Sequence, residues 1–306
     1  MLKRMNIWIT EARAPFLTAS IVPILLGAVI AWVVTGTFHW GLFLLTFVAG
    51  VCLHIGTNVA NDYFDHKSSD DDINTEFVRP FTGGSRMIQK GIMTPREVLT
   101  ESIVFFTIGC LIGLYLAWMR GPMILLLGLI GVFSGFFYTA PPFRLANLGI
   151  GEAVVGINFG VLMVLGTFYV QTGFLSWEPV AAGLPVTFLI AAVLYINEFQ
   201  DYTADKAVGK NHLVVRWGKE KAVLGYVVIM GLAYVSVIIA VALNIITPYA
   251  LIVLITTPLT VRSYLNARKF YDDSLKLAPS NAATIMIHSS VGVLLCVGYV
   301  LERFLS

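Results

Sequence analysis

The 306-residue sequence contains little charge. Only 12% of its residues are Asp, Glu, Lys or Arg, whereas 57% are hydrophobic, and the mean hydropathy is +0.81. A water-soluble protein commonly has about 25% charged residues, so this chain has too few to cover a soluble surface. The formal net charge of +2 is also too small to indicate nucleic-acid binding. The composition therefore predicts a protein that resides in a lipid bilayer.

Cysteine is scarce as well. The chain has three cysteines, Cys52, Cys110 and Cys296, and each lies within an apolar stretch. Their spacing matches no metal-binding motif. We expect them to pack as small apolar side chains.

Long apolar stretches dominate what remains. Stretches of about 20 residues, enough for a helix to cross a bilayer, occur nine times. They cover approximately residues 15–35, 41–62, 98–119, 122–141, 150–171, 178–199, 222–243, 246–265 and 283–303. Because these runs are continuous and do not alternate with polar residues, they favour helices over a β-barrel. The expected fold is all-α, with nine transmembrane helices around a central cavity.

Basic residues lie unevenly along this predicted bundle. Of the 20 Lys and Arg residues, only Arg120 and Arg303 fall on one side of the membrane. The positive-inside rule then places the N-terminus and the long loops in the cytoplasm and the C-terminus outside, for a protein of the cell membrane. We expect one domain, 1–306, with cytoplasmic loops at about 62–97, 141–149, 200–221 and 266–282.

Acidic residues concentrate in two windows, one after the second apolar stretch and one after the sixth. Ten of the 18 acidic residues lie there: Asp62, Asp65, Asp70, Asp71, Asp72, Glu76, Glu198, Asp201, Asp205 and Glu220. A run such as Asp70–Asp72 is also typical of a solvated loop, and this interpretation stays open for Asp70 and Asp72.

Polar side chains repeat at helical spacing in both windows. Four residues of the first window share one helix face if the second helix continues that far: Asn58, Asn61, Asp62 and Asp65. Three residues of the second window do the same: Asn197, Asp201 and Asp205. The two rows of oxygen ligands suggest an internal duplication, in which two pseudo-repeated four-helix halves face each other across the cavity.

Carboxylates that face one another inside a bundle repel unless cations lie between them. Oxygen ligands without His or Cys favour Mg²⁺, which commonly keeps a substrate phosphate as a further ligand. The pattern therefore predicts Mg²⁺ as cofactor and a diphosphate as substrate. Departure of an allylic diphosphate would leave a carbocation that a nucleophile captures.

At these residues the sequence resembles the UbiA superfamily of intramembrane prenyltransferases, whose two motifs are broadly NDxxDxxxD and DxxxD. The first motif begins here at Asn61 and Asp62, and the second runs from Asp201 to Asp205. One departure is Ser69, where the general motif expects an acid. The 1,4-dihydroxy-2-naphthoate branch of the superfamily places that acid two residues later, at Asp71.

Further segments are similar to that branch, and the resemblance covers nearly the whole chain. They are the segments 138–144, 149–152, 166–171 and 210–218. The resemblance implies one Mg²⁺ on Asn61, Asp65 and Asp71, and a second on Asp201 and Asp205. Asp65 and Asp201, together with Tyr138 facing the carbocation, would be the catalytic residues.

The resemblance also implies roles for residues near the acids. Five residues would contact the diphosphate: Asn58, Lys67, Arg86, Arg144 and Lys210. Asn197 and Glu152 would contact the acceptor. Each basic residue alone is equally consistent with membrane topology, Tyr138 with an aromatic belt, and Glu152 with a helix N-terminus.

The implied function is Mg²⁺-dependent transfer of a polyprenyl group to an aromatic acceptor in the bilayer, with 1,4-dihydroxy-2-naphthoate of menaquinone biosynthesis as first choice. Other acceptors stay open: 4-hydroxybenzoate, a haem precursor or geranylgeranylglyceryl phosphate. A cation-coupled secondary transporter is the alternative of another class, although its acids would be expected at the membrane midplane. The signature of a phosphatidyl transferase is missing from the sequence.

Overall fold

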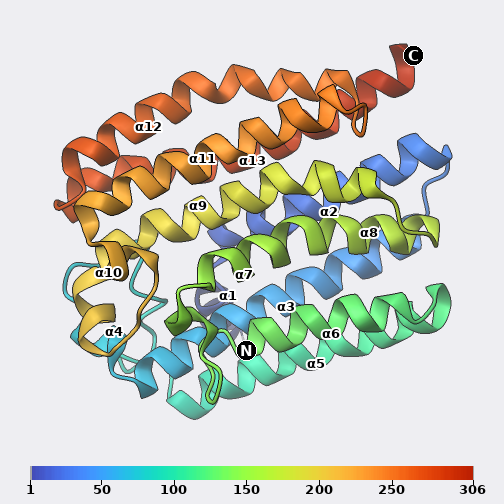
Figure 1. Cartoon of the computed structure of the whole chain (residues 1–306). Coiled ribbons are helices and arrows are strands. Elements are labelled where there is room, and N and C mark those ends of the chain that lie inside the picture. Colours follow the sequence, from blue (N-terminus) through green and yellow to red (C-terminus); the bar gives the residue numbers. More distant parts are fainter. Residues whose placement is uncertain (1, 306) are drawn as a thin grey trace.

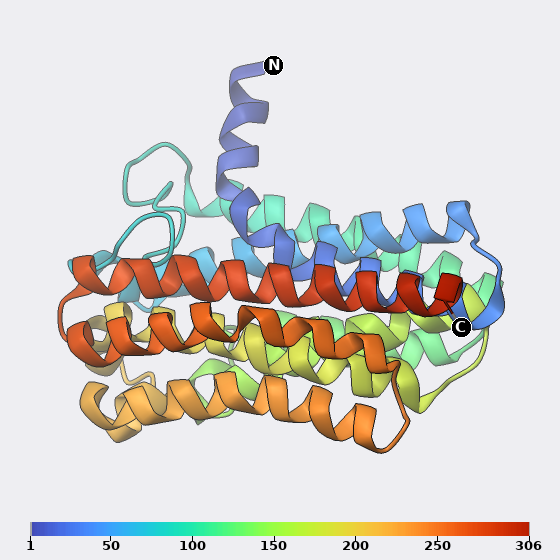
Figure 2. The same cartoon turned by 90° about the horizontal axis from the view of Figure 1, so that it is seen from above.

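The computed structural model describes residues 2–305, and the side chains of all of these except 2–6, 14 and 15. Long helices run side by side along one axis and form a single bundle (Figure 1). In the view from above, α1 (Leu2–Glu11) stands roughly perpendicular to that axis (Figure 2).

The helices follow the predicted spans closely. They are α2 (Thr18–Thr35), α3 (Trp40–Lys67), α5 (Pro95–Arg120), α6 (Met123–Phe136), α7 (Gly151–Ile157) continued through a π-helical turn into α8 (Met163–Thr172), α9 (Trp177–Ala207), α11 (Lys219–Ala242), a 3₁₀ segment (Pro248–Thr256) continued as α12 (Thr257–Phe270), and α13 (Ser274–Leu305). Within residues 2–305, eight of these units are long and apolar enough to span a membrane, and α6 is a shorter apolar helix. The nine-helix, all-α prediction is confirmed.

The helices extend further than the apolar runs do. Helix α3 continues to Lys67 and α9 to Ala207, so both polar rows lie on helices as expected. The expected loop at 266–282 is mostly helical, because α12 ends at Phe270 and α13 begins at Ser274. Hydropathy marks where a helix leaves the apolar layer, whereas backbone hydrogen bonds decide where it ends.

Two short helices occupy the predicted cytoplasmic loops. They are α4 (Asp70–Ile73), after α3, and α10 (Leu213–Trp217), after α9. Figure 1 shows both at the same end of the bundle, and the C-terminus at the opposite end. Helices α3 and α9 run in the same direction, so their polar C-terminal turns meet under these loops.

A small apolar core holds the loop after α4 in place. Met87 and Met93 of the loop are buried with Ile55 and Val59 of α3, and Trp8 of α1 packs against the same cluster. Burial of apolar side chains from three segments fixes the loop over the end of α3.

Candidate active site

Six aspartates from both polar windows gather at the end of the bundle where α4 and α10 lie. We call them the acidic site: Asp62, Asp65, Asp70, Asp71, Asp201 and Asp205. Lys210, which follows α9, joins three of them. Its ammonium lies 2.9 Å from Asp65 Oδ1 and 3.3 Å from Asp205 Oδ1, and it also contacts Asp70. Burial alone would lower the pKa of Lys210, but these carboxylates raise it well above its ordinary value.

Asp71 and Asp70 are buried next to other carboxylates. Burial, followed by Asp65 and Asp62, raises the pKa of Asp71 to about 8. For Asp70, burial also raises the pKa to about 8, in opposition to the nearby Lys210. Ionisation of these two carboxyl groups is therefore unfavourable, first because they are buried and second because other carboxylates lie close to them. A divalent cation such as Mg²⁺ would favour the ionised forms, and a cluster of carboxylate oxygens fits its preference for oxygen ligands.

Asp62 and Asp71 lie close to the glycine turn that precedes Ser85. Asp62 accepts a hydrogen bond from the Ser85 backbone N–H at 2.7 Å. Gly84 has a φ of +63°, and a Cβ placed on it would lie 2.7 Å from Asp71 Oδ2 and 2.9 Å from Asp62 Oδ1. Glycine therefore lets the backbone approach both carboxylates.

The loop after α4 also ties α9 into the site. Asn74 donates a hydrogen bond of 2.7 Å to Asp201 Oδ1, and Glu76 accepts one of 2.9 Å from Thr203. Asn61 Oδ1 accepts a hydrogen bond of 2.8 Å from Thr139, which orients its amide oxygen. The predicted aspartate ligands of the two windows therefore lie in one cluster, whereas the described partner of Asn61 is Thr139.

The predicted diphosphate residues differ in where they lie. Lys210 is inside the acidic site. Arg86 donates to the Asp71 carbonyl oxygen at 2.9 Å and lies over the Phe77 ring. Lys67 and Arg144 are exposed, and no contact described in residues 2–305 joins either of them to the acidic site.

Arg13 is a cation that the sequence interpretation counted only for topology. Its guanidinium lies 3.9 Å from Asp62 Oδ1, and Arg13 also lines the cavity described below. A short 3₁₀ turn separates Arg13 from α2 in the chain. The path of the chain at this turn places the Arg13 guanidinium next to Asp62 of α3. No motif in the sequence indicated this contact.

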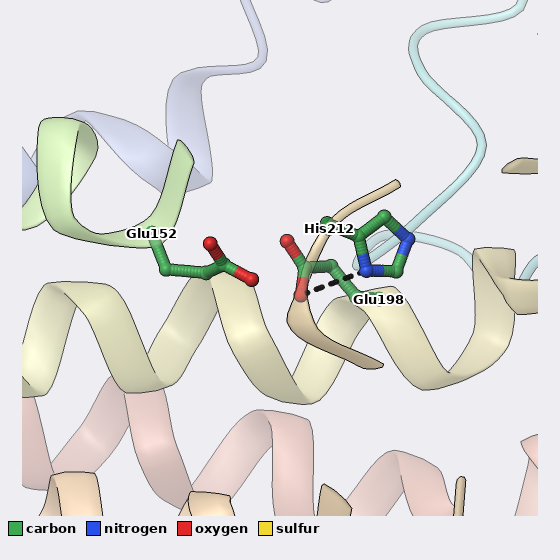
Figure 3. A group of neighbouring side chains, drawn as sticks. All are labelled: Glu152, Glu198 and His212. Atoms are coloured by element: carbon green, nitrogen blue, oxygen red, sulfur yellow. Dashed lines mark ion pairs between the residues drawn. The ribbon is translucent and has the colours of Figure 1, made fainter. Parts of the chain in front are cut away.

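A second buried cluster lies beside the acidic site (Figure 3). His212 Nε2 is 3.0 Å from Asp205 Oδ2, and Nδ1 is 3.3 Å from Glu198 Oε2. Burial lowers the pKa of His212, but Glu198 and Asp205 outweigh it and raise the pKa to about 10. Glu152 Oε1 accepts a hydrogen bond of 2.9 Å from the Leu213 N–H, so Glu152 caps α10 instead of its own helix.

In this second cluster His212 lies between two carboxylates, those of Glu198 and Asp205, and pairs with both. Ligand atoms of Glu152, Glu198 and His212 lie within 4.8 Å of one another, as a metal site requires. A protonated His212, however, already supplies a positive charge to Glu198. Glu152 Oε2 has no hydrogen-bond partner in the described part of the chain, which leaves one carboxylate oxygen free.

A cavity of about 340 Å³ lies inside the bundle, and Arg13, which contacts Asp62 of the acidic site, is one of its lining residues. Arg13, Asn61, Tyr138 and Asn197 line its polar end, whereas most other lining residues are apolar. Burial, with Glu198 and Glu152 nearby, raises the pKa of Tyr138 well above its ordinary value, so its phenol stays neutral. An acidic site that suits a cation therefore lies near an apolar cavity, the combination that a prenyl diphosphate would require.

Comparisons with known proteins agree with this geometry. The family model described as "UbiA prenyltransferase family" matches residues 20–290. The chain is 31% identical over 258 residues, 84% of each chain, to a 1,4-dihydroxy-2-naphthoate octaprenyltransferase of Mycobacterium tuberculosis. It is 27% identical over 300 residues to a 2-carboxy-1,4-naphthoquinone phytyltransferase of Synechocystis, covering 96% of this chain and 93% of the relative.

A solved structure shares the fold. A UbiA homologue from Archaeoglobus fulgidus bound to DMAPP and Mg²⁺ superimposes with a TM-score of 0.60 at 16% identity, covering 95% of this chain and 99% of the other. At that identity the likeness concerns the fold alone. The match over most of the chain, together with the acidic site above an apolar cavity, shows that this protein belongs to the UbiA prenyltransferase family and is a membrane-embedded prenyltransferase.

Proposed function

We propose that this enzyme transfers a polyprenyl group from a prenyl diphosphate to 1,4-dihydroxy-2-naphthoate, at the cytoplasmic face of the membrane. The observation that carries the proposal is the junction at Lys210, where carboxylates from both polar windows meet above the apolar cavity. Support for the acceptor comes from the M. tuberculosis relative, whose name specifies that substrate.

The residues of the acidic site fit divalent cations. Asn61, Asp65 and Asp71 would hold one Mg²⁺, and Asp201 and Asp205 a second. When bound, Mg²⁺ neutralises the diphosphate and favours its departure from the allylic carbon. Lys210 and Arg13 would place positive charge beside the departing diphosphate. Charged donors form stronger hydrogen bonds to phosphate oxygens than neutral donors do.

The cavity residues would handle the organic part of the reaction. The apolar walls would accept the isoprenoid tail and exclude water that could quench the carbocation. Tyr138, at the polar end, would present its ring to the cation. The acceptor would lie near Asn197 and Glu152, and its substituted carbon would form the new C–C bond as the carboxylate leaves as CO₂.

Asn197 and the free oxygen of Glu152 support this placement. Asn197 lines the cavity, and its Oδ1 accepts a hydrogen bond of 2.7 Å from Asn281, which fixes its orientation. Glu152 lies on α7, the continuation of the chain after Tyr138. Asn197 lines the same cavity as Tyr138, and Glu152 lies close enough to Tyr138 to affect its pKa, so these two polar groups suit an acceptor that carries hydroxyl groups.

A membrane assay tests the acceptor. Membranes that contain the protein receive a polyprenyl diphosphate, Mg²⁺ and one acceptor at a time: 1,4-dihydroxy-2-naphthoate, 4-hydroxybenzoate or geranylgeranylglyceryl phosphate. We expect prenylated product and CO₂ with dihydroxynaphthoate alone. Product with another acceptor alone would keep the transferase chemistry and overturn the acceptor assignment. Membranes that contain the Asp201→Asn variant serve as the control, because they show how much diphosphate is released without catalysis by this enzyme.

A further inference from the structure

Three buried side chains that can bind a metal come together beside the acidic site, each from a different segment. Glu152 lies at the start of α7, Glu198 on α9 and His212 directly before α10 (Figure 3). Their exposed fractions are only 2%, 6% and 3%. Each residue offers one ligand atom, and the three atoms lie within 4.8 Å of one another. Because the cluster is buried, its polar atoms need partners inside the protein.

Each of the three side chains nevertheless leaves one atom without a hydrogen-bond partner among the described residues. These atoms are Glu152 Oε2, Glu198 Oε2 and His212 Nδ1. The distance of 3.3 Å between His212 Nδ1 and Glu198 Oε2 is that of an ion pair. A buried carboxylate oxygen without a partner costs free energy, and a metal ion bound to all three atoms would remove that cost.

The other polar atoms of Glu152 and His212 are already held by the protein. Glu152 Oε1 accepts a hydrogen bond of 2.9 Å from the Leu213 N–H. His212 Nε2 lies 3.0 Å from Asp205 Oδ2. A metal-binding histidine commonly donates its second ring N–H to a carboxylate, which fixes the orientation of the ring. Asp205 therefore holds the imidazole with Nδ1 next to Glu198.

The spacing and the kinds of ligand atom favour zinc over magnesium. Two atoms that each lie about 2.1 Å from a tetrahedral zinc ion are about 3.4 Å apart. His212 Nδ1 and Glu198 Oε2 are 3.3 Å apart. Imidazole nitrogen suits Zn²⁺, whereas Mg²⁺ prefers oxygen ligands. A zinc ion at Nδ1 would take the place of a proton that pairs His212 with Glu198.

We propose that Glu152, Glu198 and His212 form a zinc site, which is separate from the magnesium ligands of the acidic site and is joined to them through Asp205. The ion would hold α7, α9 and the start of α10 together. Three protein ligands leave the fourth position of a zinc ion open, so an acceptor can still lie near Glu152. The inference goes beyond the proposed function, since the site requires neither donor nor acceptor.

Zinc binding to the purified protein tests the inference. Protein freed of metal with a chelator is dialysed against Zn²⁺ with excess Mg²⁺, which competes for sites made of oxygen ligands, and bound zinc is measured by elemental analysis. We expect one zinc ion per chain, and at least about tenfold weaker binding in Glu198→Gln and in His212→Gln. X-ray absorption spectroscopy of the zinc-loaded wild type should show one imidazole among the ligands. Oxygen ligands alone would overturn the inference, whether or not the variants fold.

His66→Gln is the matched control. His66 Nδ1 also lies 3.3 Å from a carboxylate oxygen, that of Asp72, but both side chains are partly exposed. This substitution should leave zinc binding unchanged, and size-exclusion chromatography shows which variants are folded. Absence of zinc from the wild type, or equally strong binding in every variant, would contradict the proposed site. Because no substrate is present, failure of the dihydroxynaphthoate assay would leave this result intact.

Discussion

Lys210 Nζ lies 2.9 Å from Asp65 Oδ1, so a loop that follows α9 neutralises a carboxylate on α3. The same ammonium contacts Asp70 and Asp205. Lys210→Met removes the common cation, and we expect the Tm without Mg²⁺ to fall by at least about 5 °C because the three carboxylates then repel. Added Mg²⁺ should raise the Tm more in this variant than in the wild type. Thermal unfolding in detergent measures both values.

Lys206→Met is the matched control for that prediction. Lys206 is exposed beside the Tyr202 ring, one turn before Lys210, and has no contact with the acidic site among the described residues. Its replacement should leave the Tm and the Mg²⁺ response unchanged. Equal effects of the two substitutions would contradict a specific role for Lys210.

Asp65→Asn and Asp201→Asn should each abolish Mg²⁺-dependent turnover while the protein still folds. Asparagine keeps the size of the side chain but removes the charge that a divalent cation requires, so we expect at least about a hundredfold lower rate of diphosphate release. Release is followed with a prenyl diphosphate in membranes, and the amount of folded protein by size-exclusion chromatography. Turnover near the wild-type level in either variant would rule out these aspartates as metal ligands.

Gly84→Ala should weaken Mg²⁺ activation. The added Cβ would lie 2.7 Å from Asp71 Oδ2 and force that carboxylate to move. Gly91→Ala separates this effect from backbone strain, because Gly91 has a nearly identical φ of +64° and no atom within 4 Å of an added Cβ. We expect the Mg²⁺ concentration for half-maximal activity to rise several-fold for Gly84→Ala only. A similar rise in both variants would point to loop strain instead.

Glu11→Gln should change how stability depends on pH. Glu11 at the end of α1 is fully buried, and burial followed by the Asp62 carboxylate raises its pKa from 4.5 to about 8. Because the folded-state pKa is raised, the stability that this group contributes is complete below about pH 4.5 and is lost as pH rises through about 8. Glutamine stays neutral, so the variant should keep a higher Tm than the wild type above pH 8.

The Tm of both proteins between about pH 5 and pH 9 measures this difference, which corresponds to a few kcal/mol at most. Asp272→Asn, at a side chain that is 81% exposed, serves as the control and should follow the wild-type curve. Parallel curves of Tm against pH for Glu11→Gln and the wild type would show that ionisation of Glu11 does not lower the stability of the folded protein.

Glu152→Gln separates two roles of one side chain. Glutamine can still accept the hydrogen bond from the Leu213 N–H through its Oε1, but it removes the charge of the free oxygen. If Glu152 binds the acceptor, the KM for dihydroxynaphthoate should rise by about tenfold with the Tm unchanged. Glu152→Ala should lower the Tm as well, because it also removes the cap of α10. An unchanged KM in Glu152→Gln would limit Glu152 to capping.

The sequence predicted the bundle well because the bilayer simplifies the relation between residues and structure. A spanning segment has to be apolar and helical, so hydropathy alone located the eight candidate spans of the described chain and the shorter apolar helix α6. Helical spacing likewise placed Asp65 on the site-facing side of α3 and Asp201 on that of α9. Hydropathy did not find the end of α12 or the start of α13, because these helices continue through polar residues.

The sequence by itself determined the class of fold, the two rows of polar and acidic residues, and the resemblance that indicated the chemistry. Tertiary structure decided which basic residues reach the acidic site: Lys210 and Arg13 do, whereas Lys67 and Arg144 stay exposed. It also decided that Glu152 caps α10 and that glycines of α5, α6 and α8 surround one cavity. The reason is physical: spacing along one helix follows from its geometry, whereas contacts between distant segments depend on how all the helices pack.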